Sequence, residues 1–136
     1  FLRLKCSNDI NWKQNYLIVR KSKTKAGLRI IPLHRSIIPL FEKRKDNTFL
    51  IGGDNNVAYS SFRTMFKTLM EQVHMKHVPY ETRHTTASML NTYGANIVAT
   101  KMLLGHSRGN SVTEKVYTHK RLPELKKAIN LIPPCA

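Results

Sequence analysis

Three segments of the chain carry side chains suited to phosphate chemistry. Arg83 stands at the start of an expected helix, His106 follows a glycine, and Tyr117 lies in the next basic stretch. Phosphodiester transfer without a metal needs a nucleophile, cations around the non-bridging oxygens and an acid for the leaving oxygen. Tyrosine, arginine, histidine and lysine side chains supply candidates for all three needs.

Carboxylates are scarce, since the 136 residues include only 8 Asp and Glu, scattered along the chain. A two-metal nuclease gathers several carboxylates around Mg²⁺, so this composition argues against one. His74 and His77 suggest a metal pair, but no third or fourth ligand stands at a fitting spacing. We therefore expect no metal site.

The chain is strongly basic, with 23 Lys and Arg and a formal net charge of +15. This excess predicts a polyanionic partner, and nucleic acid fits best because each neutralised phosphate releases counterions. A membrane surface would call for a basic amphipathic helix with Trp or Phe on its apolar side, and we find none. The sequence also lacks the run of about 18 apolar residues that a membrane span needs.

The two cysteines, Cys6 and Cys135, lie near opposite ends of the chain and form no CxxC pair. This arrangement predicts free thiols in a reducing compartment, so we expect a soluble cytoplasmic protein. The length fits one domain with one core, because domains commonly hold roughly 100–150 residues.

Two short β-rich runs, 16–19 and 28–33, flank a basic stretch at 20–27. The pattern predicts a β-hairpin whose connecting loop carries cationic side chains. A further short strand is expected at 6–10, although the alternation of apolar and polar residues there is weak.

Helical periodicity dominates the rest of the chain. After a short helix at 37–41, a stronger one is expected to be capped by Ser60 or Ser61. Its apolar stripe predicts a buried face made of Phe62, Met65, Phe66, Leu69, Met70 and Val73. Later helices are expected at 81–93 before Gly94, from about 97 to Gly105, at 112–119 and at 122–132. The fold class is therefore α+β, mainly α, with one small β-hairpin.

Three motifs resemble the second conserved box of the tyrosine recombinases, the family of the phage integrases. They are YETRHTTASML at 80–90, LLGHS at 103–107 and VYTH at 116–119, in the family's order and spacing. The run KTKAGLRIIPL at 23–33 looks like the family's β-hairpin, whose lysine enters the active site. The resemblance covers nearly the whole chain and is closest to integrases of phages and conjugative transposons of Gram-positive bacteria.

The resemblance implies the catalytic core of the DNA breaking-rejoining enzymes and a reaction on double-stranded attachment sites without a cofactor. Tyr117 would attack the scissile phosphate and form a 3′-phosphotyrosyl link. Arg83 would donate two hydrogen bonds to non-bridging oxygens, for which a planar guanidinium is well suited. His106 would stabilise the developing charge, and Lys23 would protonate the leaving 5′-oxygen.

Neighbouring cations are expected to contact DNA. Lys21 and Lys25 lie in the same hairpin loop as Lys23, so either is an alternative to it as the acid, and Arg108 follows the LLGHS motif. The histidines His84 and His119 are interpreted as structural. His84 is expected to anchor its helix by hydrogen bonding.

Two departures from the family pattern bear on activity. Tyr80 stands where the family usually has a histidine, and a phenol with a pKa of about 10 is a poor base near neutral pH. The family's first catalytic arginine would lie before residue 1, and Arg3 matches a variable position instead. Residues 1–136 are therefore expected to be the C-terminal catalytic domain of a truncated recombinase, weak or inactive alone, without its N-terminal DNA-binding domains.

The last expected helix, 122–132, has an apolar stripe. In this family such a helix often docks onto a neighbouring protomer of a DNA-bound tetramer, and packing on its own domain is an equal alternative. The implied location is the bacterial cytoplasm, at the nucleoid when DNA is bound. Rival interpretations are a catalytically inactive DNA-binding module of the same fold, a basic RNA- or ribosome-binding protein, and a type IB topoisomerase.

Overall fold

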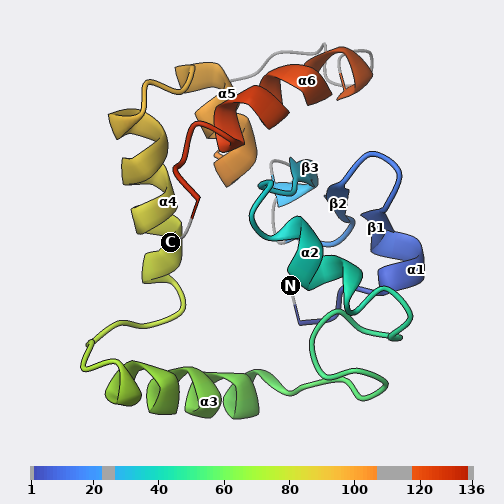
Figure 1. The fold of residues 1–136 in the computed structure, drawn as a ribbon, viewed down its shortest axis with the longest axis vertical. Helices are drawn as coiled ribbons and strands as arrows, with labels where there is room; N and C mark the ends of the chain where they lie inside the picture. The colour runs from blue at the N-terminus through green and yellow to red at the C-terminus, as the bar shows by residue number, and fades with distance from the viewer. Residues whose placement is uncertain (1, 23–26, 107–117, 135–136) are drawn as a thin grey trace.

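The computed structural model describes residues 2–22, 27–106 and 118–134, which are mainly helical with a small antiparallel sheet (Figure 1). No helix in these ranges is long and apolar enough to cross a membrane. In chain order the elements are α1 (Cys6–Asp9), β1 (Ile10–Asn11), β2 (Tyr16–Val19), β3 (Arg29–Pro32), α2 (Ile38–Glu42), α3 (Tyr59–Gln72), α4 (Glu81–Thr92), α5 (Ile97–Leu104) and α6 (Thr118–Ile129).

The predicted hairpin is confirmed, and a third strand extends it. The sheet order is β1-β2-β3, with both pairs antiparallel. In the β2–β3 pair, Leu17 faces Ile31 and Val19 faces Arg29. The pairing of Val19 with Arg29 fixes the end of the sheet from which the basic connection departs.

The strand expected at 6–10 is wrong for most of that range, because Cys6–Asp9 forms one helical turn and only Ile10 enters the sheet. Asp9 explains the difference. Its carboxylate accepts a hydrogen bond from the backbone N–H of Lys5 at 2.9 Å, and its own N–H donates to the Lys5 carbonyl at 2.9 Å. Such local bonds compete with a strand ladder, and here they close a turn instead.

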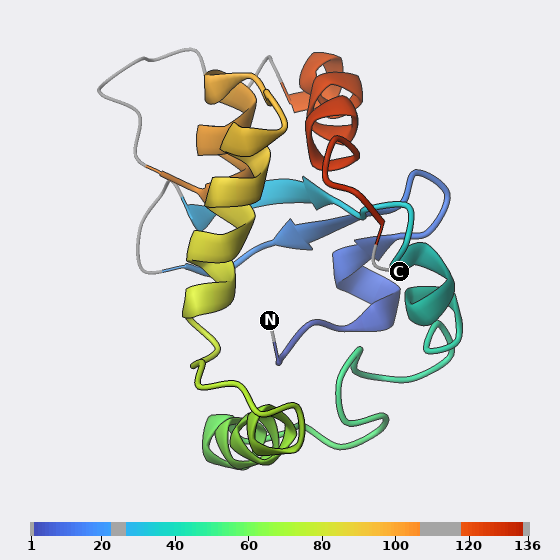
Figure 2. The same cartoon turned by 60° about the vertical axis from the view of Figure 1, so that its left-hand side comes forward.

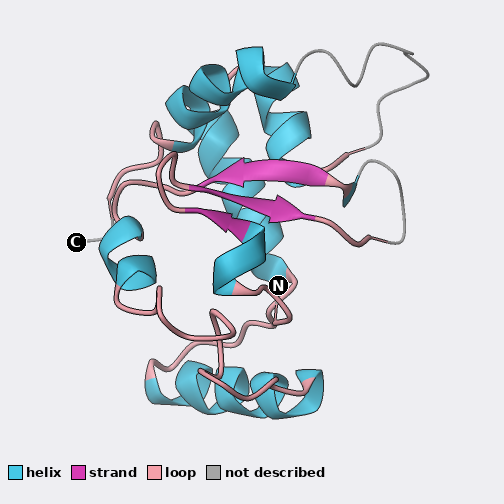
Figure 3. Cartoon of the chain, turned by 90° about the vertical axis from the view of Figure 1, so that its right-hand side faces the viewer, coloured by secondary structure: helices cyan, strands magenta, loops and turns pink. Residues whose placement is uncertain are grey.

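Two apolar clusters hold the chain together. The first joins the sheet to α1 through Leu4, Cys6, Ile10, Leu17, Leu33 and Leu50, and Ile38 and Phe41 of α2 pack against it. The second joins α4, α5 and α6 through Leu90, Ala99, Leu103, Leu125 and Ala128. α5 and α6 lie against β3 at one edge of the sheet, and α1 lies against β1 and β2 at the other (Figures 1 and 3).

The predicted ends of α4 and α5 are confirmed. Gly94 follows α4 with φ +70° and Gly105 follows α5 with φ +67°, the left-handed conformation that glycine adopts without strain. Asn96 caps the start of α5, because its side-chain oxygen accepts bonds from the N–H groups of Val98 and Ala99 at 2.8 and 3.3 Å. These caps fix the short connection between the two helices.

α3 differs from its prediction in two ways. Its N-cap is Ala58, which makes no side-chain cap, and Ser60 and Ser61 lie inside the helix. None of its residues is buried, and Met65 is 65% exposed and Leu69 50% exposed. Phe62, Phe66 and Met70 of the predicted face are half-buried. The described part of the chain therefore covers this face only in part, and α3 lies apart from both clusters (Figure 1).

α6 begins before the predicted start at 122, keeps Pro123 in its interior and ends before the predicted end at 132. Its apolar stripe packs on its own domain, since Leu125 and Ala128 are each 4% exposed within the second cluster. After the helix, the side-chain oxygen of Asn130 accepts the backbone N–H of Arg35 at 3.0 Å. The predicted helix at 112–119 lies outside the described residues except for its last two positions.

The thiol of Cys6 is free, as predicted, and it is fully buried. It donates to the carbonyl oxygen of Arg44 at 3.3 Å. Burial raises the pKa of the Cys6 thiol above its ordinary value, so the thiolate is disfavoured. Cys6 is therefore a packing residue; Cys135 lies outside the described residues.

Leu90→Ala is expected to destabilise the fold by about 2–5 kcal/mol, because this side chain is 0% exposed where α4 meets α5 and α6. The measurement is the free energy of unfolding in urea. Met89→Ala, at the preceding position, is the control and should lose about 1 kcal/mol or less, because Met89 is 36% exposed. Equal losses for the two variants would contradict the assigned core.

Candidate active site

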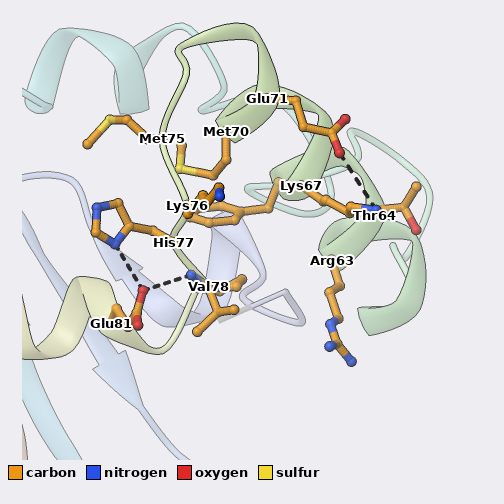
Figure 4. Close-up of a pocket in the computed structure, with 12 residues that line it drawn as sticks. Arg63, Thr64, Lys67, Met70, Glu71, Met75, Lys76, His77, Val78 and Glu81 are labelled. Carbon is orange, nitrogen blue, oxygen red and sulfur yellow. Dashed lines mark hydrogen bonds and ion pairs between the residues drawn. The ribbon is translucent and has the colours of Figure 1, made fainter.

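A carboxylate holds the start of α4. The Oε2 atom of Glu81 accepts the backbone N–H of Val78 at 3.0 Å and lies 3.0 Å from Nδ1 of His77. Figure 4 shows the Glu81 side chain turned back toward these two groups. An acidic residue in the first turn of a helix satisfies free N–H groups and interacts well with the helix dipole. This local structure fixes the turn that carries Arg83.

These contacts lower the pKa of Glu81. The hydrogen bond from the Val78 N–H lowers the pKa of Glu81 below 4.5, and the hydrogen bond with His77 lowers it further. Both contacts favour the charged carboxylate. His77 is thus engaged with Glu81. Within residues 2–22, 27–106 and 118–134, no three His, Cys, Asp or Glu side chains gather as metal ligands would.

A cavity of about 670 Å³ lies between α3 and the connection to α4 (Figure 4). Met70 from α3 and Met75 from the connection line it, together with basic side chains such as Arg63 and Lys76. None of the predicted catalytic residues that the structure describes is among its lining residues. The cavity adjoins the start of α4 through Pro79 and Glu81, which flank Tyr80.

Arg83 lies on the inner side of α4. It is half-buried, as are Thr86 and Ala87, and Leu90 is fully buried. Residues at i, i+3, i+4 and i+7 share one face of a helix, so this face of α4 turns toward the second cluster. The packing of Leu90 thus directs Arg83 inward from the N-terminal end of the helix.

A second arginine lies close to Arg83. Arg29, the first residue of β3, is half-buried, and burial lowers its pKa, with a further lowering from the positive charge of Arg83. Neither arginine takes part in an ion pair within the described part of the chain. Two guanidinium groups near one another without a carboxylate form a site of positive potential that favours an anion.

The end of α5 places His106. The N–H of His106 donates to the carbonyl of Lys101 at 3.0 Å, and that of Gly105 donates to Met102 at 3.1 Å. This closing turn leaves the His106 side chain exposed. Nε of Arg29 donates to the Leu103 carbonyl at 2.9 Å, so the last turn of α5 is tied to the start of β3.

The segments of Arg83, His106 and the basic hairpin therefore meet at one end of the sheet. Figure 2 shows α4 and α5 beside the end at which β3 begins. Lys21 is exposed and follows shortly after Val19, the residue that pairs with Arg29. The sheet register thus brings the base of the basic connection to the two arginines.

Tyr80 lies at the N-cap of α4 and is 65% exposed. Its ring meets that of His84 edge-on, with centroids 5.3 Å apart and an interplanar angle of 76°. This contact fits the structural interpretation of His84. The predicted site residues Lys23, Lys25, Arg108 and Tyr117 lie outside the described residues, and their roles stay predictions.

Arg29 was missed by the sequence analysis, which treated it as one position of a strand. A weak signal was available, because Arg29 is a charged residue within the apolar run Leu28 to Leu33. A charge at such a position is half-buried only when it is hydrogen-bonded. One acceptor of its bonds, however, is the carbonyl of Leu103, which is distant in the sequence and which no sequence pattern indicates.

The amino-acid sequence of this mainly helical chain matches a known family. The chain belongs to the phage integrase family, whose sequence profile matches residues 1–123. It is similar to tyrosine recombinase XerA of Pyrococcus horikoshii, with 29% identity over 131 aligned positions. The alignment covers 89% of this chain and 45% of XerA, so the chain spans about half the length of this relative. The resemblance to the tyrosine recombinases is confirmed, whereas the likeness to Gram-positive phage integrases stays a prediction.

The lowered pKa of Glu81 gives a pH prediction. A carboxylate whose folded pKa lies below its ordinary 4.5 contributes its full stabilisation above that pH and loses it as the pH falls through the lower folded pKa. We expect the NMR shift of the Val78 amide proton to titrate with a midpoint below 4.5. In Glu81→Gln this transition should vanish. A Val78 transition at or above 4.5 would contradict the hydrogen bond.

Proposed function

We propose that the protein containing this chain is a site-specific tyrosine recombinase that cuts and rejoins DNA through a 3′-phosphotyrosyl intermediate. The observation that carries the proposal is the pair of guanidinium groups, Arg29 and Arg83, without carboxylate partners in the described residues. Membership of the phage integrase family supports it. A phosphodiester is the anion that such a site in a chain of net charge +15 would bind.

The proposed reaction is a transesterification, so one phosphoester bond forms for each one that breaks. The phenol of Tyr117 releases its proton to solvent water and its oxygen attacks phosphorus. The bond from phosphorus to the 5′-oxygen breaks, and the Lys23 ammonium protonates the leaving oxygen. Arg83 donates two hydrogen bonds to the non-bridging oxygens, and His106 donates a third. Attack by another 5′-hydroxyl reverses the steps and rejoins the strands.

Tyr80 takes the place of the usual family histidine in this proposal. Its exposed position at the start of α4 suits a hydroxyl that donates to the phosphate rather than a base. Lys21, Lys25 and Arg108 bind the DNA backbone around the scissile phosphate. Their contacts give affinity without base recognition, so the attachment sequence is selected elsewhere in the protein.

We further propose that residues 1–136 act as the C-terminal catalytic domain of a longer cytoplasmic chain that assembles as a tetramer on its attachment sites. α6 is packed on its own domain, with Leu122 and Leu125 buried. Docking of α6 on a neighbour would therefore exchange these same contacts between protomers. The catalytically inactive DNA-binding module is the second candidate, and the exposed Tyr80 in place of histidine favours it.

The nucleophile is tested with the intact protein and a nicked suicide substrate that carries its attachment site. We expect a covalent protein–DNA adduct that survives denaturant and is absent in Tyr117→Phe, because phenylalanine lacks the attacking oxygen. Tyr93→Phe, which removes an exposed phenol after α4, is the matched control and should form adduct. DNA binding without adduct by the unsubstituted protein would favour the inactive module.

The phosphate clamp is tested with Arg83→Lys in the same assay. An ammonium keeps the charge but cannot donate two parallel hydrogen bonds, so we expect single-turnover cleavage to fall by about 10²–10³-fold. Arg44→Lys, which replaces an exposed arginine outside the candidate site, is the control and should cleave at the unsubstituted rate. An unchanged rate in Arg83→Lys would remove Arg83 from the proposed mechanism.

A further inference from the structure

We propose that Arg29 is a positioning residue that holds the basic hairpin and the His106 turn at a fixed separation around the scissile phosphate. The inference rests on the proposed recombinase function. Two hydrogen bonds carry it: Nε of Arg29 donates to the Leu103 carbonyl at 2.9 Å, and Nη1 donates to the Gly27 carbonyl at 2.9 Å.

Each acceptor belongs to a segment with a proposed chemical role. Gly27 is buried at the base of the connection that contains Lys23, the proposed acid. Leu103 is 5% exposed in the last turn of α5, directly before the Gly105 turn that carries His106. One side chain thus links two segments that are distant in sequence, and a shift of either would move its catalytic group.

The chemistry of the link requires an arginine. A guanidinium presents several N–H donors in one rigid plane, so Arg29 reaches two carbonyls at once, whereas a lysine ammonium is a compact charge on a flexible stem. Carbonyls in the last turn of a helix lack partners within the helix, and a cation there is favoured by the helix dipole. The contact with Leu103 therefore closes the end of α5 as well as connecting it to β3.

The position of Arg29 also affects Arg83. Their positive charges repel one another, and no carboxylate pairs with either in the described part of the chain. Nε and Nη1 of Arg29 each donate to a carbonyl, whereas the Arg83 guanidinium makes no hydrogen bond within the described part of the chain, so we assign the phosphate to Arg83. The two arginines have different tasks, since Arg29 orders the backbone and Arg83 holds the anion.

The test compares Arg29→Met and Arg29→Lys in the intact protein, with Arg44→Met as the control for loss of a surface charge. Two quantities are measured with the suicide substrate, the single-turnover cleavage rate at saturating DNA and the Kd for DNA. We expect both Arg29 variants to cleave about 10- to 100-fold more slowly, because small displacements of catalytic groups have effects of this size. Their Kd should stay within about threefold of the unsubstituted value, as for a residue that acts on the chemical step.

A second substrate isolates the link to the hairpin. A 5′-bridging phosphorothiolate has a thiolate leaving group that needs no proton, so it bypasses the acid. Relative to the unsubstituted protein, Arg29→Met should cleave this substrate at least about tenfold faster than it cleaves the ordinary phosphodiester. Absence of recovery would contradict a role in placing Lys23.

Other outcomes overturn the inference in distinct ways. An unchanged rate in Arg29→Met, or a rate restored by Arg29→Lys, would show that two-point geometry is not required. A fall in rate matched by an equal loss of DNA affinity would make Arg29 a DNA-binding residue instead. If the unsubstituted protein itself forms no adduct, the recombinase proposal fails and this inference fails with it. Urea unfolding checks each variant, and Arg29→Lys carries the test if Arg29→Met does not fold.

Discussion

The burial of Leu90 between α5 and α6 is the interaction on which the arrangement of the site depends. This side chain is 0% exposed, and it fixes the rotation of α4 about its axis. Arg83 lies two turns earlier on the same face, so its direction follows from that packing. The same cluster holds α5 beside β3, where Arg29 meets the Leu103 carbonyl. An apolar contact thus determines where the cations of the site lie.

The small number of acidic residues leaves the cations of the site without carboxylate partners in the described part of the chain. The described ion pairs use Asp9, Glu71 and Glu81, and none of them includes Arg29 or Arg83. Arg29 meets carbonyl oxygens, which neutralise no charge, and Arg83 meets no carboxylate. A composition of 8 acidic against 23 basic residues therefore keeps the field of the site positive. In a chain richer in acid, an internal ion pair would compete with a phosphate for the same guanidinium.

Local signals predicted local structure well. The hairpin strands, and the left-handed turns at Gly94 and Gly105, follow from residue types within a few positions of each feature. The prediction of a strand at 6–10 was wrong because it weighed apolar alternation and omitted the bonds between Asp9 and Lys5. The α3 stripe was read correctly as amphipathic, but periodicity alone does not say what covers it. Arg29 was missed because one of its partners, the Leu103 carbonyl, is distant in the sequence and leaves no pattern there.

The use of carbonyl acceptors by Arg29 has a consequence for substitutions in this chain. Every amino acid carries a backbone carbonyl, so substitutions at 27 or 103 that preserve the backbone path leave both bonds intact. Only a change at 29 removes them. The two bonds therefore constrain the side chain at 29 and leave the side chains at 27 and 103 to other requirements, such as the burial of Leu103 in the second cluster. A backbone acceptor thus separates the hydrogen bond from the identity of the residue that provides it.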